Sequence, residues 1–144
     1  MNHDSYSDAY IKNVLTSART IAVVGASANA ARASNGVMKL LIAKGHKVIP
    51  INPRHAGGEI LGQTVYASLA AVPGPVDMVD IFRKTADAIG VVREAVAQRE
   101  RLGLKSVWMQ LDIRDDAVAA EAEAAGLKVV MDRCPAIEYR RLSL

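Results

Sequence analysis

Residues 20–36 read TIAVVGASANAARASNG, and this stretch decides the fold. An apolar run from Ile21 to Val24 leads into the small-residue turn Gly25-Ala26-Ser27, and a helical pattern begins near Ser34. A strand, a tight turn and a helix N-terminus in succession direct backbone N–H groups and the positive end of a helix dipole at one point. The stretch therefore predicts a binding site for a phosphorylated small molecule.

Apolar runs alternate with amphipathic segments on both sides of this stretch. A leading helix is expected within residues 1–18, and Pro135 is expected to begin a last short helix. The patterns predict strands at 20–24, 47–51, 77–82, 106–110 and 128–131, helices at 34–44, 86–102 and 115–125, and an irregular crossing at 54–75. Such alternation, with nearly continuous apolar strands, is typical of a parallel sheet covered on both faces. We predict a single α/β domain over residues 1–144, a Rossmann-like doubly wound parallel sheet of about five strands with helices on both faces.

The composition excludes several classes of protein. With 51% hydrophobic and 23% charged residues, the 144-residue chain is expected to be globular and cytoplasmic. Its formal net charge of +3 comes from scattered basic residues without interleaved aromatics, which argues against nucleic-acid binding. No apolar run approaches a membrane span, and Asp4 and Asp8 make the N-terminus unlike a secretory signal. The single cysteine, Cys134, excludes an internal disulfide, and it has no histidine at a metal-ligand spacing.

The turn at Gly25 departs from the known nucleotide-binding fingerprints. The dinucleotide pattern G-x-G-x-x-G needs three glycines and an acidic residue at the end of the second strand. Only Gly25 is present, and the second predicted strand ends in Asn52-Pro53-Arg54 with no carboxylate for a ribose hydroxyl. No Walker G-x-x-x-x-G-K-[ST] pattern follows Gly25. Arg54 instead suits an additional ribose phosphate, as in NADP or coenzyme A.

A set of short motifs then occurs in one order along nearly the whole chain. They are GAS at 25–27, Arg32 and Ser34, IPINP at 49–53, GEILG at 58–62, SLAAVP at 68–73, VDIF at 79–82, VWMQ at 107–110 and DRCP at 132–135. Together they resemble the small bacterial CoA-binding-domain proteins, which are similar to the nucleotide-binding domain of the succinyl-CoA synthetase alpha subunit. The resemblance extends from about residue 15 to residue 142.

The resemblance implies that coenzyme A or an acyl-CoA lies across the strand ends. It places Gly25, Ala26 and Ser27 at the phosphates, Arg32 and Ser34 as an added charge and hydroxyl, Asn52, Pro53 and Arg54 by the adenosine ribose and its phosphate, and Phe82 and Arg83 beside the adenine or pantetheine. Cys134 has two interpretations: a small buried apolar residue, or, at a strand end before Pro135, a partner for the thiol of a bound CoA in a mixed disulfide. One departure is Leu111-Asp112, where a glycine is expected near the end of the fourth strand.

The sequence signals no catalytic group. No nucleophile, base and orienting residue occur together, and the domain that carries the synthetase's catalytic histidine has no counterpart here. The leading hypothesis is a stand-alone, non-catalytic carrier, sensor or accessory module with a small-molecule nucleotide ligand and an unknown protein partner. The alternatives are a small NADP- or NAD-binding oxidoreductase or redox sensor, and an interaction subunit that has lost its ligand.

Some residues also have a purely structural interpretation. Ser34 fits a helix N-cap, and His46 is expected to be exposed in a turn. Trp108 and Met109 are expected in the core, and Asp77 and Asp80 are not an acid–base pair because positions i and i+3 of a strand face opposite sides. His55 is a candidate for the mouth of the site.

Overall fold

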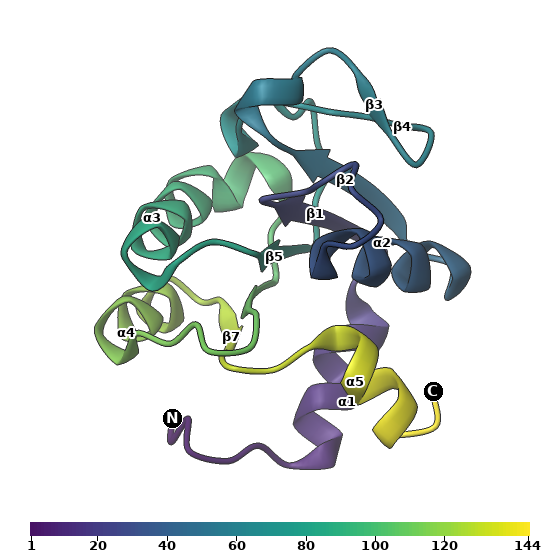
Figure 1. The fold of residues 1–144 in the computed structure, drawn as a ribbon. Coiled ribbons are helices and arrows are strands. Elements are labelled where there is room, and N and C mark those ends of the chain that lie inside the picture. The colour runs from purple at the N-terminus through teal and green to yellow at the C-terminus, as the bar shows by residue number, and fades with distance from the viewer.

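A computed structural model describes residues 1–144 and shows a five-stranded parallel sheet with helices on both faces (Figure 1). The strands lie in the order β2-β1-β5-β6-β7. Their bounds are Lys47–Ile51 for β2, Thr20–Val24 for β1, Met78–Ile81 for β5, Ser106–Met109 for β6 and Lys128–Val130 for β7. The predicted fold class is confirmed. Because the chain leaves β1 first for β2 and then crosses to β5 on its other side, the topological switch point lies between β1 and β5.

Two helical layers cover the sheet. Helices α1 (Asp8–Ser17), α2 (Ala33–Ala43) and α5 (Pro135–Arg141) lie on one face, and α3 (Thr85–Leu102) and α4 (Asp116–Ala124) lie on the other (Figure 1). The predicted helices and strands of the domain are present, most with ends shifted by one or two residues. None of the helices has the length and apolar character that crossing a membrane requires.

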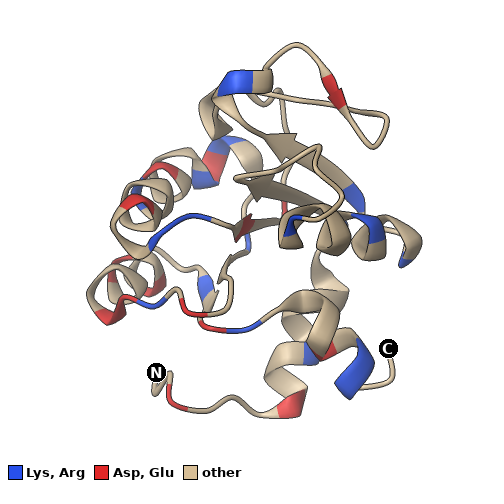
Figure 2. Cartoon of the chain, viewed as in Figure 1, with Lys and Arg blue, Asp and Glu red and all other residues tan.

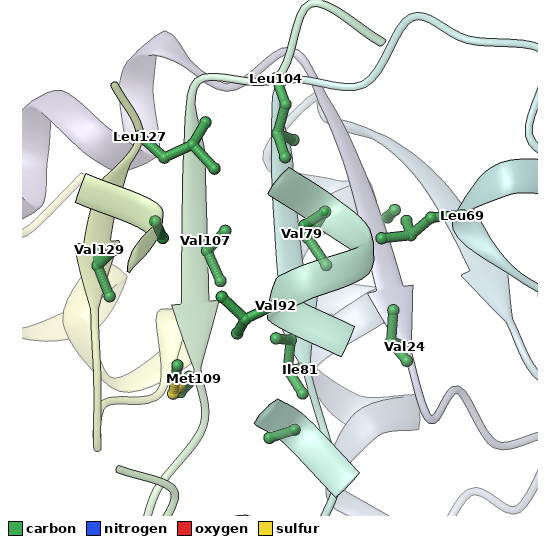
Figure 3. Close-up of a cluster of buried hydrophobic side chains, with 14 of the residues drawn as sticks. Val24, Leu69, Val79, Ile81, Val92, Leu104, Val107, Met109, Leu127 and Val129 are labelled. Atoms are coloured by element: carbon green, nitrogen blue, oxygen red, sulfur yellow. The ribbon is translucent and has the colours of Figure 1, made fainter. Parts of the chain in front are cut away.

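Each layer encloses its own apolar core because the buried strands are apolar on both faces. On the α3/α4 side, Val79 and Ile81 of β5 pack with Val107 and Met109 of β6 and with Val92 of α3 (Figure 3). On the α1/α2/α5 side, Trp108 is fully buried, and its Nε1–H donates to the Arg133 carbonyl at 2.8 Å. The prediction that Trp108 and Met109 belong to the core is confirmed.

The segment from 54 to 75 is more regular than expected. It contains two 3-10 turns, Pro53–His55 and Leu69–Ala71, and an antiparallel hairpin of β3 (Glu59–Ile60) and β4 (Gln63–Thr64). The two-residue loop of the hairpin, Leu61-Gly62, has positive φ at both positions, and leucine rarely adopts that conformation. Tyr66 extends the sheet beyond β2, donating its N–H to the Pro50 carbonyl and accepting from the Asn52 N–H.

Two tyrosine hydroxyls hold helix α1 and the segment before it against β7 by hydrogen bonds. The Tyr10 hydroxyl donates to the Val129 carbonyl at 2.8 Å and accepts from the Val129 N–H at 3.0 Å. The Tyr6 hydroxyl accepts from the Met131 N–H at 2.9 Å. Burial raises the pKa of Tyr10 to about 12, so this hydroxyl keeps its proton at physiological pH.

His46 is not the exposed turn residue that the sequence predicts. It is half-buried, with Nδ1 2.6 Å from the Ala18 carbonyl and Nε2 in contact with the Tyr139 hydroxyl. Burial lowers the pKa of His46 although the bond to Ala18 opposes the shift. His46 therefore ties the turn before β2 to α5, and these two segments are far apart in the sequence.

Candidate functional site

A cleft of about 560 Å³ opens beyond the carboxyl ends of β1, β2 and β5, at the switch point. Ligands of open α/β sheets bind at this position. The cleft is lined by Gly25, Ala26, Ser27, Asn29, Arg32, Ala33, Ser34, Asn52, Arg54, His55, Phe82 and Arg83. The fold thus brings together all the predicted site residues except Pro53 and Cys134.

Gly25 holds the ends of β1 and β5 close together. Its φ is +87°, and a Cβ atom at this position would lie 2.3 Å from the Phe82 carbonyl oxygen. Any side chain would therefore force the β1–α2 loop away from β5. The N–H groups of Gly25 and Ala26 are already used, because both donate to the Ile51 carbonyl.

The N–H groups that remain free lie further along the loop. Those of Ser27, Ala33 and Ser34 donate to no protein acceptor. The loop keeps its shape through Ser27 Oγ, which accepts from the Asn29 N–H at 3.1 Å, and through Asn35 Nδ2, which donates to the Ser27 carbonyl at 2.9 Å. The phosphate-suited geometry predicted at Gly25 is therefore supplied by Ser27 and by the first turn of α2.

Ser34 is not the N-cap of α2. Arg32 takes the capping position without a side-chain cap bond, and Ser34 lies inside the first turn, where it is buried. The sequence prediction fails here because Ala33, an ordinary helix former, already has helical geometry. Both the Arg32 guanidinium and the first free N–H groups of α2 are consequently left for a ligand.

Three arginines give the cleft its charge. The side chains of Arg32, Arg54 and Arg83 form no ion pair and no hydrogen bond with the protein, and no carboxylate lines the cleft. Figure 2 shows basic positions where α2 begins, after β2 and between β5 and α3. Asn52 orders its part of the rim, since its Nδ2 donates to the Ala26 carbonyl and its Oδ1 accepts from the Arg54 N–H, both at 2.9 Å.

Pro53 lines a second, smaller hollow beside the cleft. This hollow has a volume of about 160 Å³, and its walls include Val24, Ile51 and Leu69. Arg83 lines both spaces and thus stands at their border. The arrangement joins a cationic cleft to a mainly apolar recess.

Cys134 lies away from both spaces. It precedes α5, is 8% exposed and packs in the core between the sheet and α1, α2 and α5. Its proposed disulfide with a bound thiol stays a prediction.

Asp112, which stands where a glycine was expected, has a φ of +67° and so adopts the left-handed conformation that glycine favours. Its N–H donates to Asp132 Oδ1 at 2.7 Å.

The sequence analysis did not select Asn29 and Ala33, which line the cleft, and it named His55 only as a candidate. From the sequence, Asn29 and Ala33 could be selected only by their position in the 25–34 loop, since neither residue type points to a ligand. His55 is the single histidine of the cleft, and no carboxylate lines the cleft to orient it. No group of acidic, histidine or cysteine side chains is placed to hold a metal ion.

Known proteins share both the sequence pattern and the fold. The profile of the family described as CoA binding domain matches residues 19–140. The uncharacterized protein YneT of Bacillus subtilis is 32% identical over 128 residues, which are 89% of this chain and 90% of YneT. A hypothetical protein from Pyrococcus horikoshii is 34% identical with a TM-score of 0.88, covering 100% of this chain and 97% of its own.

Two further structures extend the comparison. A protein from Thermus thermophilus is 35% identical with a TM-score of 0.86, covering 95% of this chain and 99% of its own. A dinucleotide-forming acetyl-coenzyme A synthetase from Ca. Korarchaeum cryptofilum is 24% identical with a TM-score of 0.62. It matches 77% of this chain but only 25% of its own, and it shows the fold alone. On the profile match and the full-length relatives, the chain belongs to the CoA binding domain family.

Proposed function

We propose that the protein is a stand-alone binding protein for coenzyme A or an acyl-CoA, acting as a non-catalytic carrier, sensor or accessory module. The observation that carries the proposal is the set of three unpaired arginines in a cleft without a carboxylate. Coenzyme A has a diphosphate and a separate ribose 3′-phosphate, and guanidinium groups bind phosphates through charge-assisted hydrogen bonds.

The cleft fits the phosphates in two ways. The free N–H groups of Ser27, Ala33 and Ser34 lie at the N-terminus of α2, where the helix dipole also favours an anion. Arg54 follows β2 at the position where an NAD-binding protein would have an acidic residue for the ribose. We assign Arg54 to the 3′-phosphate and Arg32 to the diphosphate, and we place Arg83 and Phe82 along the pantetheine or the adenine.

The absence of carboxylates near His55 supports a binding role rather than catalysis. General acid–base chemistry on a thioester needs a positioned proton acceptor with a matched pKa. The 160 Å³ recess beside Arg83 offers apolar walls to a part of the ligand that lacks charge.

Coenzyme A is expected to stabilise the folded protein. A ligand at about 100 times its dissociation constant raises the free energy of unfolding by about 2.7 kcal/mol, which shifts the melting temperature by several degrees. Thermal melting with CoA, acetyl-CoA, NADP and NAD measures this directly. A shift with NADP and none with millimolar CoA would contradict the proposal and favour the oxidoreductase alternative.

Replacement of the arginines should separate the two phosphate sites. Arg32→Ala and Arg54→Ala are each expected to weaken CoA binding by about 1.5–3 kcal/mol, the range for a hydrogen bond to a charged group. With dephospho-CoA, Arg32→Ala keeps its effect and Arg54→Ala loses it. Arg19→Ala is the matched control, because the Arg19 side chain is also unpaired but lies before β1, at the opposite end of the sheet. Titration calorimetry gives the dissociation constants, and equal losses with both ligands would refute the assignment of Arg54.

A further inference from the structure

The carboxyl group of Asp80 is an unusual group for the middle of a sheet. Asp80 is the one acidic residue within the five parallel strands, and it lies on β5 in register with Val23 of β1 and Trp108 of β6. Its exposed fraction is 0%, and neither carboxyl oxygen has a hydrogen-bond partner. A buried carboxylate without a partner is far less favourable than the neutral acid. Burial accordingly raises the pKa of Asp80 well above its usual value.

Two further oxygen atoms in the same layer lack a donor. They are Oδ1 of Asn35, on α2, and Oε1 of Gln110, both buried. Gln110 follows β6 by one residue, and its N–H donates to the Ile81 carbonyl at 3.2 Å, so it continues the ladder beside β5. Amide oxygens only accept hydrogen bonds. A protonated Asp80 adds a hydrogen-bond donor to this buried layer, whereas an ionised Asp80 adds only acceptors.

The segments that carry Asp80 and Asn35 also supply walls of the cleft. Phe82 directly follows β5, two residues after Asp80, and it packs against the same core as Met78 of β5 while also lining the cleft. Asn35 directly follows Ser34 and holds the Ser27 carbonyl, and both serines line the cleft. A charge on Asp80 would therefore lie on a strand whose end leads into the cleft to which an anion binds.

No other charged group compensates Asp80. Glu138 of α5 is paired with Arg133 at 3.6 Å and Arg141 at 2.6 Å, and His46 is bonded to Ala18 at the far end of β1. Burial is the sole cause of the shift in its pKa. The remaining titratable groups of this layer are Tyr6, Tyr10, Cys134 and Tyr139, and those on the cleft side are Arg32, Arg54, His55 and Arg83.

We propose that the proton on Asp80 is linked to anion binding in the cleft, so that phosphates above the sheet hold the proton in place and its loss at alkaline pH weakens binding. The inference rests on the proposed function for the identity of the anion, but the linkage applies to any phosphate-bearing ligand. It is reciprocal, because a ligand that favours the protonated form must bind that form more tightly.

The test compares the wild-type protein, Asp80→Asn and Asp87→Asn by titration calorimetry, with CoA and with inorganic pyrophosphate as probes, between about pH 5 and pH 9.5. Asparagine matches the shape of the neutral acid and has no proton to lose. Asp87→Asn is the matched control, since Asp87 is exposed in the first turn of α3. Effects of His55 and of the ligand's own titration are common to all three proteins and cancel in the ratios.

We expect wild type and Asp80→Asn to bind equally at the acidic end, and wild type to become roughly tenfold weaker at the alkaline end. Asp87→Asn should follow wild type. Proton uptake on binding, measured in two buffers of different ionisation enthalpy, should be larger for wild type than for Asp80→Asn within the same pH range. Infrared spectra of the unmodified protein give an independent readout, because the protonated-carboxyl band of Asp80 should fade over that range.

Identical pH dependence in wild type and Asp80→Asn would overturn the inference. If pyrophosphate shows the difference and CoA does not bind at any pH, the linkage stands and the proposed ligand is wrong. If neither probe binds at any pH, both the linkage and the proposed function are contradicted.

Discussion

Gly25→Ala is expected to lower the free energy of unfolding by at least about 2 kcal/mol and to abolish the stabilisation by CoA. The alanine would have to keep a φ of +87°, and its Cβ would meet the backbone carbonyl oxygen of Phe82 at 2.3 Å. Phe82 directly follows β5, and its N–H donates to the Val24 carbonyl at 2.8 Å, so its backbone cannot move aside as a flexible side chain can. The β1–α2 loop would shift instead, and with it Ser27 and the N-terminus of α2. Urea denaturation with and without CoA measures both effects.

Gly36→Ala is the control for this prediction. Gly36 lies within α2 and has no positive φ, and a Cβ there would meet nothing within 4 Å. Alanine at that helix position should raise the free energy of unfolding by about 0.5–1 kcal/mol and leave CoA binding intact. Unchanged stability and CoA binding in Gly25→Ala would show that the contact with Phe82 does not constrain the loop.

The second large effect concerns stability and pH. Asp80→Asn is expected to make the protein more stable than wild type at neutral and alkaline pH, by an amount that grows with pH. In the unfolded chain Asp80 has the ordinary pKa of an aspartate, about 3.9, and in the folded protein burial raises it. Between these two values only the folded protein holds the proton. The wild-type free energy of unfolding therefore falls, relative to the variant, by about 1.4 kcal/mol per pH unit.

The difference in the free energy of unfolding between wild type and Asp80→Asn should be constant below about pH 4, and it should become constant again above the raised pKa of Asp80. Urea denaturation at a series of pH values gives it directly. Asp87→Asn should show no such growth, because Asp87 is exposed. A difference between wild type and Asp80→Asn that does not change with pH would mean that the folded protein does not perturb Asp80.

The fold could be predicted because its local signals agree with its tertiary structure. Each parallel strand is an apolar run, and the ends of α2, α3 and α4 are marked by Gly45, Gly103 and Gly126, all with positive φ. The hairpin β3–β4 was missed because Leu61 occupies a turn position where glycine or asparagine is usual. The chain after the hairpin is held to β2 by the bridge between Tyr66 and Ile51, a tertiary contact that a single sequence does not display.

Most residues that line the cleft were selected from the sequence, but their hydrogen bonds were not predicted. Gly25 was expected to approach the phosphates, but its N–H donates to the Ile51 carbonyl, and the glycine is needed because a Cβ there would meet the Phe82 carbonyl oxygen. Asp80 was considered only as a partner of Asp77 in an acid–base pair, and that pairing was rejected. Its burial depends on β1, β6 and the α2 layer all covering one side chain, which spacing along β5 does not reveal.

The tyrosines that fasten the N-terminal segment to β7 have a consequence for solubility. β7 is an outer strand, and the exposed N–H and C=O groups of an outer strand can pair with a second molecule and start aggregation. The hydroxyls of Tyr6 and Tyr10 occupy three such groups, and Tyr66 occupies the Pro50 carbonyl and the Asn52 N–H at the opposite border. Both borders of the sheet are thereby partly closed to pairing with a strand from another copy.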